Sequence, residues 1–251
     1  LPGYFTLAAT RVVWDGIEAQ RIFSLVFHIA CALALYRLLY GLQRAALPGA
    51  PASPPVQFDG PAALRAAIGA AAIALHPVAV YGAAYLVQRS IVLATLFSLL
   101  SLILVLRGLQ SGHYRDTLWA ALLYSLAVLS KEHAVLLPAV ALPLAVLSGA
   151  DRRLSLRHTA LYLAACAPAT IFIALLSTGA IGKPYEPQFD QIAAQMGDAS
   201  GQDISSTPLA LSAVTQAGLF FRYLTLWFWP DLARMSIDLR VDFLGTWSAG
   251  W

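Results

Sequence analysis

Long apolar runs separated by shorter polar segments are the dominant pattern of this sequence. A bilayer needs about 20 predominantly apolar residues per helix, so each run predicts a membrane-spanning helix. The runs that approach this length cover residues 21–41, 62–77, 86–107, 157–177 and 210–229. The last run ends in Trp227, Phe228 and Trp229. Such aromatic crowding is typical of a membrane interface, so this run either crosses the membrane or lies along it.

Two shorter apolar runs lie between residues 116 and 150, on either side of the polar sequence Ser130-Lys131-Glu132-His133. Each run has about 15 residues, or roughly 23 Å as an α-helix, against a hydrocarbon core of about 30 Å. We therefore expect the turn between them to lie below the membrane surface. With the longer runs, the pattern predicts an all-α, polytopic transmembrane bundle of about seven spans.

The remaining segments are more polar. Residues 1–20 carry Arg11, Asp15 and Glu18, too many charges for a span, and suit a helix that lies at the membrane interface. Residues 42–61 are rich in proline, which predicts an exposed linker. The expected organisation is an interfacial end of an outer loop at 1–20, a bundle at 21–177 with the linker at 42–61, an outer polar loop at 178–209, and a final apolar helix and tail at 210–251.

Composition supports the membrane interpretation. The chain is 59% hydrophobic and only 12% charged, and its mean hydropathy is +0.69. Soluble domains have about a quarter charged residues. The net charge of +3 is small and no basic block follows the pattern of a nucleic-acid-binding tail, so we expect no nucleic-acid partner. The five histidines are scattered without metal-ligand spacing, so we expect neither a metal nor another cofactor.

Arginine is concentrated in alternate loops and their flanks. Cytoplasmic loops carry such an excess of basic residues, so the side that holds the 42–61 linker and the 107–116 and 150–157 loops is expected to face the cytoplasm. The protein is then a multi-pass membrane protein, and its unusual polar clusters fall on the outer face. The arginines concerned are Arg37, Arg44, Arg65, Arg107, Arg115, Arg152, Arg153 and Arg157.

The turn at Lys131, Glu132 and His133 is the first candidate site. Ionisable groups at membrane depth are costly and commonly mark function. The lysine and the histidine could hold a phosphate, with Glu132 orienting one of them. The alternative is an internal pair of Lys131 and Glu132 that caps a helical hairpin.

Two further clusters are expected on the same side. Gln88 and Arg89 open a span, and the planar fork of arginine suits phosphate or carboxylate, although an interfacial arginine that reaches for water gives the same pattern. His76 precedes Pro77 at the end of a span and is expected mainly to bond across that turn. His28 lies within a span, where a bond to a neighbouring helix is the favoured interpretation.

Three motifs occur in a fixed order along the chain. Together they resemble bacterial multi-spanning relatives of the transmembrane O-mannosyltransferases that carry tetratricopeptide repeats. The early stretch from Leu1 to His28 also fits that family. The motifs are His76-Pro77-Val78 with Tyr85-Leu86-Val87-Gln88-Arg89, Leu93-Ala94-Thr95-Leu96-Phe97 and Arg107-Gly108; then Leu129-Ser130-Lys131-Glu132-His133-Ala134 with Leu137-Pro138; and last Arg222-Tyr223-Leu224 with Trp229-Pro230 and Met235-Ser236-Ile237-Asp238.

The resemblance implies the GT-C fold, a location in a bacterial inner membrane, and transfer of a sugar from a polyprenyl-phosphate-linked donor to an acceptor on the outer face. Besides the donor and membrane lipids, it implies an exported acceptor protein such as a pilin. The donor phosphate is assigned to Lys131 and Arg89, and Glu132 is expected to orient Lys131. The cavity wall is assigned to His133, Gln88 and His76.

The sequence departs from the family pattern in two respects. The family places an acidic catalytic residue in the first outer loop, and this chain begins near the end of that loop, so we expect the acid upstream of Leu1 and name no catalytic residue. Ser90 and Ile91 also stand where relatives often carry a polar or acidic residue. The alternative function is a non-catalytic polytopic subunit, or a transporter-like protein, that binds a lipid or anion in an outer-facing cavity.

Overall fold

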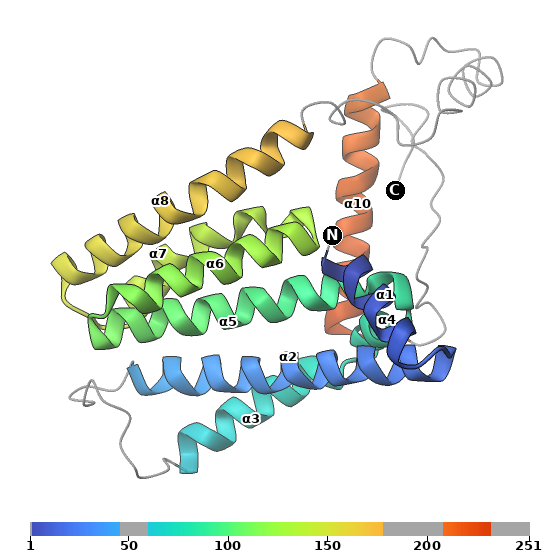
Figure 1. The fold of residues 1–251 in the computed structure, drawn as a ribbon, viewed down its shortest axis with the longest axis horizontal. Coiled ribbons are helices and arrows are strands. Elements are labelled where there is room, and N and C mark those ends of the chain that lie inside the picture. The colour runs from blue at the N-terminus through green and yellow to red at the C-terminus, as the bar shows by residue number, and fades with distance from the viewer. Residues whose placement is uncertain (1, 46–59, 178–207, 232–251) are drawn as a thin grey trace. The chain divides into compact units, whose positions relative to one another are not determined.

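The computed structural model describes residues 2–45, 60–177 and 208–231, and their regular structure is helical throughout (Figure 1). The predicted all-α class is therefore confirmed. The described α-helices are α1 (Pro2–Val13), α2 (Ile17–Ala45), α3 (Gly60–Ala74), α4 (Pro77–Ala84), α5 (Arg89–Ser111), α6 (Tyr114–Ser130), α7 (Ala141–Leu147), α8 (Arg152–Ser177) and α10 (Pro208–Phe228), and the 3₁₀ segments are η1 (Leu86–Gln88) and η2 (Glu132–Val140).

Three of the described helices are long and apolar enough to cross a membrane: Ile17–Ala45, Arg89–Ser111 and Arg152–Leu176. Two shorter apolar stretches, Gly60–Ala74 and Glu132–Leu147, do not meet this length. The helices occur where the apolar runs predicted them, but a count of about seven spans remains a prediction.

Two predicted boundaries differ from the structure. The first helix ends at Val13 and residues 17–20 already belong to α2, so the predicted interfacial segment 1–20 is divided between two helices. The predicted linker 42–61 overlaps the end of α2 and the start of α3. Residues 46–59 and 178–207, which contain most of the predicted linker and outer loop, lie outside the described residues.

The chain divides into two compact units, Leu1–Ala174 and Leu175–Trp251, and the first contains the candidate residues. Within it, α5 and α6 form an antiparallel hairpin (Figure 1). The turn begins at Gly112, whose φ of +72° is a left-handed conformation that glycine adopts without strain. The Gly112 N–H donates to the Gly108 carbonyl and closes the end of α5.

Gly108 allows α5, α6 and α8 to approach closely near this turn. A Cβ added at Gly108 would lie 2.8 Å from Thr117 Oγ1 and 3.3 Å from His158 Nδ1. Those two side chains share a buried hydrogen bond of 2.7 Å between α6 and α8. The absence of a side chain at Gly108 thus permits this contact.

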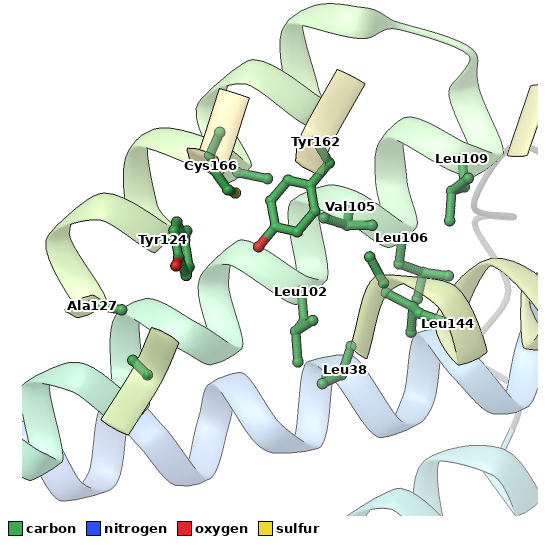
Figure 2. Close-up of a cluster of buried hydrophobic side chains, with 14 of the residues drawn as sticks. Leu38, Leu102, Val105, Leu106, Leu109, Tyr124, Ala127, Leu144, Tyr162 and Cys166 are labelled. Carbon is green, nitrogen blue, oxygen red and sulfur yellow. The ribbon is translucent and has the colours of Figure 1, made fainter. Parts of the chain in front are cut away.

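The core lies mainly between α5, α6 and α8, with apolar side chains also from α2, η2 and α7 (Figure 2). Buried hydroxyl pairs join its helices. Tyr162 shares a hydrogen bond of 2.8 Å with Ser101, and Tyr124 shares one of 2.7 Å with Thr170. The two tyrosine rings pack edge to face at 6.5 Å. Because buried hydroxyls need partners, these bonds fix how the helices face one another.

The break between α3 and α4 accounts for the hydrogen bonds of His28 and His76. Pro77 has no N–H, so carbonyls at the end of α3 lose their normal helical donors. His28 Nε2 lies 2.9 Å from the Ala74 carbonyl, which confirms the predicted bond from α2 to a neighbouring helix. The Val78 N–H donates to His76 Nδ1 at 3.2 Å, so His76 also stabilises the start of α4.

The segment after Lys131 is a 3₁₀ helix rather than the expected α-helical run. Pro138 lies inside it and removes one backbone donor. A 3₁₀ helix rises about 2.0 Å per residue, so η2 and α7 together extend over roughly 28 Å, compared with roughly 24 Å for an α-helix of the same residues. The turn at Lys131 is therefore expected to lie less deeply below the membrane surface than the residue count alone indicates.

Candidate functional site

The hairpin separates two ends of the first unit. Arg89 begins α5 and Lys131 follows α6, so both lie at the end that we call the Lys131 end (Figure 1). Helix α1 lies there too, since a Cβ added at Gly3 would be 2.8 Å from Ser90 Cβ. At the opposite end of the unit, the turn after α7 lies against the end of α2, since a Cβ at Gly149 would be 3.5 Å from the Ala45 carbonyl oxygen.

The predicted pair of Lys131 and Glu132 is present. Lys131 has extended backbone angles and ends α6, and its Nζ lies 3.0 Å from Glu132 Oε1. The side chains are 38% and 61% exposed, so the ammonium can reach a ligand without unfolding. Glu132 lies outside the three candidate spans, and its pKa is lowered by its own backbone N–H and then by Lys131. A carboxylate held ionised in this way is a weak general base.

Arg89 is placed differently from a surface phosphate ligand. Its side chain is 0% exposed, and its guanidinium donates to neutral acceptors on α1 and α2. Nε lies 3.2 Å from Ser24 Oγ, Nη1 lies 3.0 Å from Thr10 Oγ1 and Nη2 lies 2.6 Å from the Gln20 carbonyl. Within the described ranges no carboxylate lies at ion-pair distance from it. In this arrangement Arg89 joins three helices.

The other candidates occupy the same region without forming one constellation. Gln88 is half-buried and directly precedes α5, while His133 is exposed beside Glu132. His76 is half-buried and accepts the local bond from Val78. Among the described residues no hydrogen bond or ion pair joins Arg89 to the Lys131 turn. Whether these side chains contact a substrate remains a prediction.

A cavity of about 330 Å³ opens at the junction of α1 and α2. Residues missed by the sequence reasoning shape it, above all Gln20, whose side chain is buried. The missed signal was a pair of polar residues, Gln20 and Ser24, one helical turn apart in a run that is otherwise apolar. The cavity is lined by Leu7, Arg11, Asp15, Gly16, Ile17, Gln20 and Leu86.

Metal binding finds no support in this part of the chain. Across residues 2–45, 60–177 and 208–231, no group of three or more His, Cys, Asp or Glu side chains could hold a metal ion. Cys31 and Cys166 are free thiols. The chemistry at the Lys131 end is therefore that of hydrogen-bond donors, cations and a few carboxylates.

Residues 57–177 match the family described as dolichyl-phosphate-mannose-protein mannosyltransferase, over just under half of the chain. No curated protein and no solved structure matches. All six candidate site residues fall within the matched segment. Over that segment the chain is similar to the dolichyl-phosphate-mannose-protein mannosyltransferases, a GT-C family of multi-pass membrane glycosyltransferases that use a lipid-phosphate-linked sugar.

Proposed function

We propose that this protein is a membrane glycosyltransferase that moves a sugar from a polyprenyl-phosphate-linked donor to an exported protein on the outer face of a bacterial inner membrane. The family match over residues 57–177 carries the proposal, because it contains every residue that the sequence singled out for donor binding. The family description favours mannose as the sugar.

Lys131 is the proposed contact to the donor phosphate. A lipid-linked donor holds its phosphate at headgroup level, and a partly exposed ammonium on the turn between α6 and η2 suits that depth. Positive charge at this position binds the donor and stabilises the phosphate as it leaves the sugar. Glu132, at 3.0 Å, holds the ammonium in place.

Arg89 has a different part in the proposal from the one first expected of it. Because its guanidinium is buried and bonded to α1 and α2, it contributes positive charge to the Lys131 end without touching the donor in this conformation. His133, Gln88 and His76 are proposed to line the path of the donor or acceptor. The proposal assigns no catalytic base, since Glu132 is already paired with Lys131.

The alternative function is a non-catalytic subunit or transporter-like protein that binds a lipid or anion. The cavity at the junction of α1 and α2 favours it, because that cavity has hydrogen-bond donors and binding a ligand without catalysis requires no catalytic carboxylate. The two functions differ in one outcome, which is whether sugar reaches an acceptor.

The test is sugar transfer in membranes that contain the complete protein, with radiolabelled polyprenyl-phosphate-mannose as donor. Losing a charge-assisted contact raises the barrier by roughly 2–3 kcal/mol, so Lys131→Ala should transfer sugar about 30- to 150-fold more slowly. Arg115→Ala is the matched control, because Arg115 is an exposed cation at the opposite end of α6. Wild-type rates in Lys131→Ala would remove the phosphate assignment. Donor binding by the unaltered protein without transfer would favour the subunit.

A further inference from the structure

Exposed arginines gather at the end of the first unit opposite Lys131. Gly108, Thr117 and His158 meet there, since a Cβ at Gly108 would lie 2.8 Å from Thr117 Oγ1, which is 2.7 Å from His158 Nδ1. Their contact brings together the end of α5 and the starts of α6 and α8, on the left of Figure 1. Because each arginine lies within six residues of one of these three positions, the cations lie at one end of the unit. We call this set the arginine cluster: Arg107, Arg115, Arg152, Arg153 and Arg157.

The carboxylates beside the cluster are already engaged. Asp116 is 8% exposed, and its two oxygens lie 3.3 Å from Arg107 Nε and 3.9 Å from Arg115 Nε. Asp151 Oδ2 accepts from the first backbone N–H groups of α8, at 2.9 and 3.2 Å, and so caps that helix. Two carboxylates among five cations leave the cluster strongly positive.

The guanidinium groups of the cluster are accessible to a ligand. The side chains of Arg152, Arg153 and Arg157 are exposed, and within the described ranges no hydrogen bond or ion pair engages them. Arg107 and Arg115 remain 63% and 74% exposed despite their ion pairs. The planar fork of arginine matches two phosphate oxygens at once, so the cluster suits a phosphate group.

An exposed apolar face continues from the cluster along α6. Arg115 is followed by Leu118, Trp119 and Leu122, which are all exposed. Residues three and four apart lie on the same face of a helix, so these side chains form one stripe that begins at a cation. Tryptophan is enriched where headgroups meet acyl chains, and Trp119 lies one turn from Arg115. The stripe is therefore typical of a helix face that passes from headgroups into lipid.

Helix α8 has the same arrangement. Arg153 and Arg157 lie on one face with Leu156 and Leu163, and all four side chains are exposed. A free phosphate or a nucleic acid gains nothing from these leucines, whereas the acyl chains of a lipid do. Cations that lead into apolar faces on two neighbouring helices therefore favour a ligand with a phosphate at one end and hydrocarbon at the other.

We propose that the arginine cluster binds the headgroup of an anionic phospholipid, whose acyl chains lie along the exposed faces of α6 and α8. From the arginine bias we expect this end of the unit on the cytoplasmic side, where the bilayer surface carries anionic lipid. The site goes beyond the proposed function, since its occupation requires no sugar transfer and no contact with Lys131.

The test uses the full chain in phosphatidylcholine nanodiscs that contain an increasing share of phosphatidylglycerol with brominated acyl chains. Bromine quenches the fluorescence of a nearby tryptophan, and Trp119 is 58% exposed. Trp119→Phe identifies the contribution of this residue among the six tryptophans. The same share of brominated phosphatidylcholine measures random contact, so the excess quenching by phosphatidylglycerol measures its enrichment at the cluster. We expect a saturable excess in the unaltered protein.

The decisive variant is Arg152→Gln with Arg157→Gln, which removes two cations without breaking an ion pair among the described residues. An arginine near an anionic bilayer surface contributes roughly fivefold in affinity, so half-maximal excess quenching should need at least about fivefold more phosphatidylglycerol. Arg11→Gln with Arg21→Gln is the matched control, because both arginines are exposed and lie at the Lys131 end. This control should titrate like the unaltered protein.

A second pair of substitutions separates charge from folding. Arg152→Lys with Arg157→Lys keeps both cations and should retain most of the excess quenching, and a loss as large as in the glutamine variant would overturn the proposal. Equal quenching by the two brominated lipids in the unaltered protein would overturn it too. Soluble glycerol phosphate, at constant ionic strength, should not displace the lipid. Displacement would identify a site for a free anion and refute the lipid assignment.

Discussion

Gly108→Ala should destabilise the packing of α5, α6 and α8. The added methyl would lie 2.8 Å from Thr117 Oγ1 and 3.3 Å from His158 Nδ1, and both atoms belong to a buried hydrogen bond. Overpacking costs about 1–3 kcal/mol, and a broken buried hydrogen bond costs a further 1 kcal/mol or so. Alanine regains about 1 kcal/mol over glycine within a helix. The net loss of unfolding free energy is therefore about 1–3 kcal/mol.

Thermal unfolding of the purified chain in detergent measures this loss. For a chain of this size, 1 kcal/mol corresponds to about 2–4 °C in Tm, so Gly108→Ala should unfold about 2–12 °C lower. Gly60→Ala is the matched control, because a Cβ there meets nothing within 4 Å. Thr117→Ala removes the atom that the methyl approaches. The double variant should therefore lose less stability than the sum of the two single variants.

The refuting result is specific to this geometry. If Gly108→Ala unfolds at the same temperature as Gly60→Ala, the helices can separate there without cost, and the close approach does not determine the packing. Full additivity of Gly108→Ala and Thr117→Ala would likewise show that the methyl group does not act through Thr117.

Two further predictions concern the same unit, and a third concerns the topology of the whole chain. Tyr124→Phe removes the hydroxyl bonded to Thr170 at 2.7 Å and should cost about 1–3 kcal/mol in thermal unfolding; an unchanged Tm would contradict it. Lys131→Arg should restore only part of the transfer that Lys131→Ala loses, because a planar fork replaces a compact ammonium, and full restoration would argue against a fitted phosphate contact. Reporters fused near Arg152 and near Asp198 should report cytoplasm and the outer side respectively, and the same side for both would refute the topology.

The helices were predictable because each rests on a local property of the sequence. Apolar runs long enough for a bilayer gave the helices, as for the run predicted at 86–107 and found at Arg89–Ser111. Pro77 ends a helix for a local reason, and His28 inside an apolar run needs a partner that only a neighbouring helix supplies. The 3₁₀ conformation of η2 was missed because an apolar run has no period that distinguishes it from an α-helix.

The environment of Arg89 was not predictable, because its partners are distant in sequence. Its contacts with Thr10, Gln20 and Ser24 bring together residues from α1, α2 and α5. From its position alone, an arginine at the start of an apolar run suits a phosphate ligand and a residue that reaches for water equally well. Neither interpretation includes full burial against neutral acceptors, which depends on tertiary structure.

The burial of Arg89 also bears on how much of the chain the site needs. Arg89 lies within the segment 57–177 that matches the mannosyltransferase family, but its three partners precede that segment. A buried guanidinium without acceptors costs several kcal/mol, so the matched segment does not contain all that stabilises its own arginine. Helices α1 and α2 therefore complete the Lys131 end, because they supply the acceptors that its buried arginine needs.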